Sequence, residues 1–219
     1  MFIHNPKVAG TSLATALIKA TLSKYQQFNY EIDLGVKKIL NRFNLLGKVD
    51  ISNPFYRDPS DEILKKYKTI HVTPQQVKSV LDEELYSKIF KFVFVRNPWD
   101  LHVSLYKYFS LKSYSKKGHK ISKMSFEEYL EWRIQKGIGL QKRFVVDQDD
   151  TQIVDFIGRF ENLSNDYSTL CQKIGIKSEE LPFLNQSNKK PYQEFYTEET
   201  RKIIADYLKE DIEYFGYSF

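Results

Sequence analysis

The run FKFVFV at residues 90–95 constrains the fold of this chain more than any other stretch of its 219 residues. It is almost entirely apolar and rich in β-branched and aromatic side chains, which favour strands. It lacks the alternation of apolar and polar residues that marks a strand with one wet face, and a run of this kind is typical of a parallel sheet covered on both faces. The sequence therefore predicts a buried strand inside an α/β fold.

Candidate strands and helices alternate along the chain, which predicts an α/β layer fold with a mainly parallel central sheet flanked by helices. The spacing of apolar residues and the capping patterns give the following expected elements. Strands are expected at residues 2–4, 67–72, 90–95 and 153–160, and helices at 11–22, from 74, from 98, at 125–136, from 163 to a cap at Gly175, and from 197. A solvated loop is expected at 112–124, and the segments near 25–60 and 110–150 are expected to be less regular and to face a substrate.

Length and composition favour a folded single domain over residues 1–219, with 42% apolar and 28% charged residues. The single cysteine, Cys171, excludes an internal disulfide, and no apolar run approaches the roughly 18 residues of a membrane span. No signal-like segment precedes the first motif, so we expect a cytoplasmic protein. Only a short strand precedes that motif, which leaves open a natural start slightly upstream of Met1.

The charge balance favours anionic ligands. Thirty-three Lys and Arg residues against 28 Asp and Glu residues give a net charge of +5. The chain shows no zinc-finger spacing, homeodomain-like helix or arginine-rich tract, so nucleic acid is not an expected partner.

The first candidate site is the loop NPKVAGTS, residues 5–12, between the first strand and the first helix. Such a loop presents free backbone N–H groups at the positive end of a helix dipole, where an anion binds. Gly10 permits close approach of the backbone, Thr11 and Ser12 add hydroxyl donors, and Lys7 adds a mobile cation. The pattern indicates an anion site; a plain turn with a solvated lysine is the alternative.

The order of residues in this loop argues against an ATP site. A Walker A loop needs G-x-x-x-x-G-K-[ST], whereas this loop has no glycine at the first position. Its Lys7 precedes Gly10 instead of following it. A conventional ATPase or GTPase is therefore not expected.

The second candidate site lies in KFVFVRNPWDLHVSLYKYF, residues 91–109, where Arg96 ends the buried strand and Ser104 follows on a helix. Ligands of open α/β sheets bind beyond the carboxyl ends of the strands, so Arg96 should meet the same crevice as Lys7. A guanidinium there can hold a second phosphate, with Ser104 as an added donor. Two separated anion sites indicate a ligand with two anionic groups.

Together these segments resemble the sulfotransferases that use 3′-phosphoadenosine-5′-phosphosulfate (PAPS), especially the carbohydrate sulfotransferase branch, sulfotransferase family 2. HNPKVAGTSL resembles the family's 5′-phosphosulfate loop, and FVFVRNPWDLHVSLY resembles its 3′-phosphate motif. GRFENLSNDY and the last 24 residues, YTEETRKIIADYLKEDIEYFGYSF, are similar to later family segments. Residues 23–65 and 110–150 are poorly covered. The resemblance implies a P-loop-like, three-layer form of the α/β fold.

The resemblance also implies roles for individual residues. The 5′-phosphosulfate is expected to bind Lys7, Ala9, Gly10, Thr11 and Ser12. The 3′-phosphate is expected to bind Arg96 and Ser104. In a late loop, Asn185 and Ser187 are expected near the nucleotide, with Lys189 or Lys190 adding charge, although a linker before the last helix explains the same residues. The family pattern usually has Arg where this chain has Leu101 and an apolar residue where it has His102, which leaves secondary contacts on that helix open.

The catalytic residues expected are His71 and Lys7. A general base needs a pKa near neutrality, and His71 ends the strand YKTIHV at the expected crevice, where the resemblance also implies a catalytic histidine. Capping of the strand or of the next helix is its alternative role. His4 is a structural candidate, His102 a packing or substrate contact, and His119 a solvated residue. Glu161 is a further candidate base, although a carboxylate in the first turn of a helix explains it too.

The resulting prediction is a PAPS-dependent sulfotransferase that acts on a hydroxyl, of a sugar or polysaccharide or of a small molecule. PAPS is the expected donor, the desulfated nucleotide PAP the product, and no metal is expected. One alternative is an ATP-using phosphotransferase, and another is a catalytically silent module that binds a nucleotide or a polyanion. The sequence leaves the acceptor and the oligomeric state undetermined.

Overall fold

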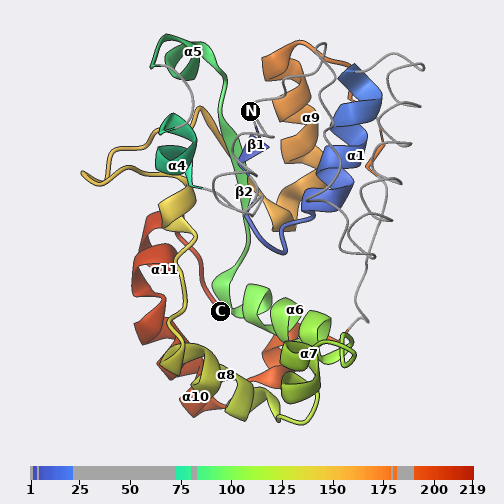
Figure 1. Ribbon diagram of the computed structural model, residues 1–219, viewed down its shortest axis with the longest axis vertical. Coiled ribbons are helices and arrows are strands. Elements are labelled where there is room, and N and C mark those ends of the chain that lie inside the picture. The colour runs from blue at the N-terminus through green and yellow to red at the C-terminus, as the bar shows by residue number, and fades with distance from the viewer. Residues whose placement is uncertain (1, 4, 22–72, 80–82, 179, 182–189) are drawn as a thin grey trace, which may run out of the picture.

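The computed structural model describes residues 2–3, 5–21, 73–79, 83–178, 180–181 and 190–219 (Figure 1). The predicted strand at 67–72 and the segment at 25–60 lie outside these ranges. The described strands are β1 (Phe2–Ile3), β2 (Phe92–Val95) and β3 (Phe156–Arg159). The described helices are α1 (Gly10–Thr21), α4 (Pro74–Lys78), α5 (Glu83–Lys88), α6 (Pro98–Ser110), α7 (Lys116–Ile121), α8 (Phe126–Gln135), α9 (Leu163–Ile174), α10 (Glu198–Tyr207) and α11 (Lys209–Phe215). Short 3-10 helices are η1 (Lys142–Phe144), η2 (Phe160–Asn162) and η3 (Tyr192–Phe195).

The three described strands form a parallel sheet in the order β1-β2-β3. Phe92 of β2 pairs with Phe2 on one side and with Phe156 on the other. All three predicted strand positions in this sheet are confirmed, although β2 and β3 are shorter than expected. β3 starts late because the N–H of Ile153 donates instead to the carbonyl of Val145, at 2.9 Å.

Helices cover both faces of the sheet, as the apolar run at 90–95 predicts. Val93 and Val95 join a buried cluster on one face, and this cluster includes side chains of α4, α5 and α11. Phe92 and Phe94 join a second cluster on the other face with side chains of α1 and α9. Figure 1 shows α1 and α9 on one side of β2 and α4 and α5 on the other. The predicted α/β arrangement with a parallel sheet is confirmed.

A third buried cluster lies beyond the carboxyl end of β2, around α6, α7, α8 and α10 (Figure 1). Its buried members include Trp99 of α6, Tyr129 of α8 and Ile204 of α10. Asn97 caps α6 by accepting from the N–H of Trp99 at 3.1 Å. The helices expected at 11–22, from 98, at 125–136 and from 163 to Gly175 are confirmed as α1, α6, α8 and α9. Gly175 ends α9 with a left-handed φ of 72°, as a helix C-cap requires.

The expectation of a solvated loop at 112–124 is wrong, because α7 occupies its middle. Ser115 caps this helix by accepting from the N–H of Gly118 at 3.0 Å, and Ile121 is fully buried against the third cluster. The segment 110–150 is therefore more regular than predicted, since it holds α7, α8 and η1. Because Ile121 is the one large apolar residue within α7, the run shows too little hydrophobic periodicity to predict a helix.

Two helices that the sequence presents as continuous are interrupted. The last helix breaks at Leu208, which separates α10 from α11. The helical pattern that starts at Pro74 appears as two helices, α4 and α5. Ser79 is the C-cap of α4, and its N–H makes the last helical bond, to the Gln75 carbonyl. Within the ranges that the structure describes, no helix is long and apolar enough to cross a membrane.

Candidate functional site

The loop between β1 and α1 turns through two residues with left-handed backbone, Lys7 with φ 63° and Ala9 with φ 60°. Gly10, which is predicted to let the backbone approach a ligand closely, is the buried first residue of α1. The first helical bond runs from Leu13 N–H to the Ala9 carbonyl at 3.0 Å. The N–H groups that precede Leu13 therefore belong to the first turn of α1, where they lack helical partners and favour an anion.

Arg96 joins the two predicted anion-binding segments. Its Nη1 donates to the Lys7 carbonyl oxygen at 3.0 Å, across 89 positions of sequence. This contact forms because β1 and β2 are parallel neighbours, so the residues that follow them meet at one sheet edge. The structure thus brings Lys7 and Arg96 together, as their positions after the two strands predict.

Two further neighbours hold the Arg96 guanidinium in place. Its Nε donates to Asp100 Oδ2 at 2.8 Å, and its Cζ lies over the ring of Phe160, 3.9 Å from the centroid. Stacking on an aromatic ring and a carboxylate partner both suit a weakly hydrated, planar cation. Among the described residues, these bonds use two of its five N–H donors, so donors remain for a ligand.

Lys7 stands in a strongly positive environment. Burial, followed by the nearby charges of Arg96 and Lys112, lowers the pKa of its ammonium. Its Nζ lies over the ring of Tyr108, 4.3 Å from the centroid. An anion bound there offsets the repulsion among these cations and favours the charged form of Lys7.

The hydroxyl residues predicted for the site occupy two helices. Thr11 is exposed and Ser12 is buried, both in the first turn of α1. Ser104 is buried on α6, midway between Asp100 and Tyr108 at four-residue spacing. Residues four apart lie on one helix face. Because Asp100 contacts Arg96 and Tyr108 contacts Lys7, Ser104 lies on the face of α6 that borders both cations.

Gln141, which is not among the predicted site residues, connects the two loops of the site. Its Oε1 accepts from Asn5 Nδ2 at 2.8 Å and from the Arg96 N–H at 3.0 Å. Its Nε2 donates to the Arg96 carbonyl at 2.7 Å, and its own N–H donates to the buried carboxylate of Asp211 in α11. No sequence pattern marks Gln141, because its partners come from three separate elements. Phe160 was detectable, since it directly follows β3 and parallel strands end at one edge.

The remaining site residues predicted from the sequence either have other roles in the structure or lie outside the described residues. Glu161 accepts from the Asn97 N–H at 2.5 Å and from the Tyr217 hydroxyl at 3.2 Å, which favours its structural interpretation. His102 is buried, and burial lowers its pKa to about 3. His71, Asn185 and Ser187 lie outside the described residues, as does His4.

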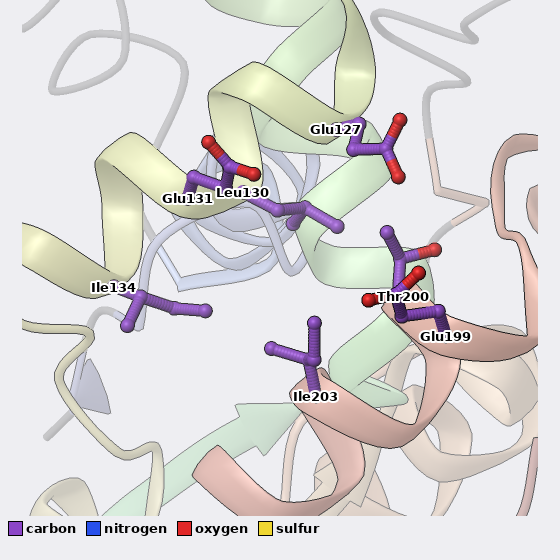
Figure 2. A pocket seen from close by; sticks show the side chains of 7 residues that line it. All are labelled: Glu127, Leu130, Glu131, Ile134, Glu199, Thr200 and Ile203. Atoms are coloured by element: carbon purple, nitrogen blue, oxygen red, sulfur yellow. The ribbon is translucent and has the colours of Figure 1, made fainter.

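A shallow hollow between α8 and α10 lies apart from these residues. Figure 2 shows Leu130, Ile134 and Ile203 pointing toward one another at its floor, with glutamates at its rim. It contains none of the predicted site residues. In the described part of the chain, no group of three or more His, Cys, Asp or Glu residues is placed to hold a metal ion.

The model of the sulfotransferase family matches residues 1–218. An uncharacterized protein of Archaeoglobus fulgidus is 30% identical over 105 residues, which cover 47% of this chain and 82% of that protein. No solved structure matches the chain significantly.

Proposed function

Because the chain belongs to the sulfotransferase family, we propose that it transfers a sulfuryl group from PAPS to a hydroxyl of a carbohydrate acceptor. PAPS carries a phosphosulfate at its 5′ end and a phosphate at its 3′ end. The bond between Arg96 Nη1 and the Lys7 carbonyl carries this proposal, because it sets two anion-binding groups side by side at one sheet edge. The same arrangement supports a P-loop-like form of the fold.

The proposed donor site has two halves. Lys7, Ala9, Gly10, Thr11 and Ser12 bind the phosphosulfate at the start of α1. Arg96 and Ser104 bind the 3′-phosphate along α6. Asn185 and Ser187 complete the nucleotide site from the late loop. The lysine ahead of the glycine and the second cation at Arg96 both favour PAPS over ATP.

In the proposed reaction, the acceptor oxygen attacks the sulfur in line. The bond between sulfur and the bridging oxygen breaks, and its electron pair stays on the phosphate of PAP. Lys7 stabilises the negative charge that develops on that oxygen. His71 takes the proton of the acceptor hydroxyl as general base. Positioning and charge stabilisation supply most of the rate enhancement, by analogy with phosphoryl transfer.

The donor is tested by thermal unfolding with PAP, with ATP and with adenosine 5′-phosphosulfate, which lacks the 3′-phosphate. PAP is expected to raise the Tm well above the effect of either other nucleotide, since a ligand that binds only the native state stabilises it. Lys7→Ala should abolish most of the PAP shift, and Lys202→Ala on the exposed side of α10 should not. Equal shifts with PAP and ATP, or no shift with PAP, would contradict the proposal.

The base is tested by replacing His71. His71→Ala should bind PAP as the wild type does and lose transfer of labelled sulfate to an acceptor found by screening, by about 100-fold or more. Unchanged turnover would show that another group accepts the proton. PAP binding by a wild type that transfers no sulfate to any acceptor would support the silent binding module instead.

A further inference from the structure

We infer that residues 217–219 are positioning residues that hold Arg96 where it binds the 3′-phosphate of the donor. They thereby set how strongly the enzyme prefers a nucleotide with a 3′-phosphate over one without it. The inference rests on the proposed function, which assigns Arg96 to this phosphate. It adds to the donor site a segment that is distant in sequence from both anion-binding motifs.

The segment 217–219 leaves α11 and reaches the loop that carries Arg96. Gly216 ends α11 with a left-handed φ of 64°, which stops the helix and turns the chain away from its axis. Figure 1 shows the end of the chain, marked C, beside the start of α6. There the Ser218 carbonyl accepts from Asn97 Nδ2 at 2.8 Å, across 121 positions of sequence. The segment therefore contacts the residue that directly follows Arg96.

Asn97 transmits this contact to Arg96 in two ways. Its Nδ2 is held by the Ser218 carbonyl, and its Oδ1 accepts from the Trp99 N–H at the start of α6. The position of Asn97 thus fixes the backbone on the carboxyl side of Arg96. It also fixes the first turn of α6, which carries Asp100, the carboxylate partner of the guanidinium.

Glu161 connects the segment to Phe160, the residue before it, over whose ring the Arg96 guanidinium lies. The Glu161 carboxylate accepts from the Tyr217 hydroxyl at 3.2 Å and from the Asn97 N–H at 2.5 Å. Burial and the charge of Glu161 raise the pKa of Tyr217, so the hydroxyl stays protonated and donates. The segment therefore connects the loop after β2, which carries Arg96, with the loop after β3, which carries Phe160.

The ring of Phe219 anchors the segment. Its edge contacts have centroid distances of 5.5, 5.7 and 5.6 Å, to Trp99, Tyr192 and Tyr196 respectively. On another side, the Arg201 Cζ lies 5.2 Å from its centroid. Rings that meet edge to face attract each other beyond the effect of burial alone. Loss of this ring should release the segment, because hydrogen bonds that water can replace contribute little by themselves.

The experiment measures by calorimetry the Kd of PAP and of adenosine 5′-monophosphate (AMP), which is PAP without its 3′-phosphate. The ratio of the two Kd values isolates the contribution of that phosphate. Phe219→Ala and Tyr217→Phe should each weaken PAP about tenfold, the effect of one misplaced charge-assisted hydrogen bond, and leave AMP unchanged. Phe219→Tyr keeps the ring and should bind PAP as the wild type does. The matched controls are Tyr214→Phe in α11 and Tyr207→Ala, which removes an exposed ring of α10, and neither should change either Kd.

Several outcomes would overturn the inference. An equal loss of PAP and AMP affinity would show that the segment supports the fold in general and not Arg96. An equal loss of PAP affinity in either control would show that its effect is not specific. A wild type that binds PAP no better than AMP would refute the proposed donor, and the inference with it. A wild type with this preference, which Phe219→Ala and Tyr217→Phe both retain, would refute the inference and leave the proposed function intact.

Discussion

At the scale of single residues, Lys7 and Ala9 hold left-handed backbone in the loop before α1. This conformation has an unfavourable free energy for residues other than glycine, and such positions cluster where a ligand needs a particular arrangement of groups. Here the arrangement directs the Lys7 carbonyl to Arg96 and its ammonium over Tyr108. The strain in this loop therefore accompanies the contacts that assemble the site.

His102 is expected to make folding stability depend on pH. Its side chain is 1% exposed, its Nδ1 has no hydrogen-bond partner in the described structure, and burial and Arg133 lower its pKa to about 3. Below the unfolded-state pKa of about 6.5, the His102 side chain binds a proton in the unfolded chain but not in the native state. The free energy of unfolding therefore decreases as the pH falls. Between pH 7.5 and pH 5.0 this group should cost about 2 kcal/mol of the free energy of unfolding.

Urea unfolding at these two pH values tests the role of His102. His102→Leu should lose less stability on acidification than the wild type does, because it removes the proton uptake. His119→Leu, which changes an exposed histidine of α7, should behave as the wild type. An identical loss in the wild type and in His102→Leu would show that His102 is not the titrating group.

At the scale of elements, α7 packs against α6 through Gly118. A Cβ at this position would fall on the backbone carbonyl of Lys112, and the Phe109 carbonyl would lie 2.9 Å from it. Gly118→Ala should therefore displace α7 and lower the free energy of unfolding by about 1–3 kcal/mol. Urea unfolding measures this loss. Lys116→Ala, on the exposed side of the same helix, should change it by less than about 0.5 kcal/mol, and equal effects of the two variants would contradict the packing argument.

At the scale of the whole molecule, Gln141 connects the site to distant parts of the chain. It bonds to Asn5 after β1, to the backbone of Arg96 after β2, and to Asp211 in α11. Asp211 is 1% exposed, and burial raises its pKa while the N–H groups of Gln141 and Lys142 lower it. Segments far apart in sequence thus share one buried network beneath Lys7 and Arg96.

Gln141→Leu should disturb stability and ligand binding together. Leaving buried polar partners without hydrogen bonds should lower the free energy of unfolding by about 1–3 kcal/mol. It should also reduce the Tm shift caused by PAP, because Arg96 and the first loop lose their shared support. Gln152→Leu is the control, because it removes a surface amide whose hydrogen bond to the Val154 carbonyl is local. It should change neither the free energy of unfolding nor the Tm shift caused by PAP. A destabilised Gln141→Leu with a full PAP shift would show that the network does not position the site.

Local signals in the sequence determined most of the described fold. The apolar run at 90–95 predicted β2 and its two covered faces, and the pair Ser125 and Glu128 predicted the start of α8 as a capping box. These features depend on neighbouring residues alone, so they are visible without a structure. The break at Leu208 and the helix α7 depend on long-range packing, and they were missed for that reason.

Some features of the candidate site were likewise predictable from the sequence, and others were not. The order of Lys7, Gly10 and Arg96 was readable because each follows a recognisable strand or begins a helix, and parallel strands end at one edge. Ser104 was readable from its place on the helix that follows Arg96. Only the tertiary structure decided that Arg96 bonds to the Lys7 carbonyl, that Gln141 supports both loops, and that Tyr108 carries two lysines. Such contacts depend on the exact distances between side chains of separate elements. Packing sets those distances, and the one-dimensional pattern does not contain them.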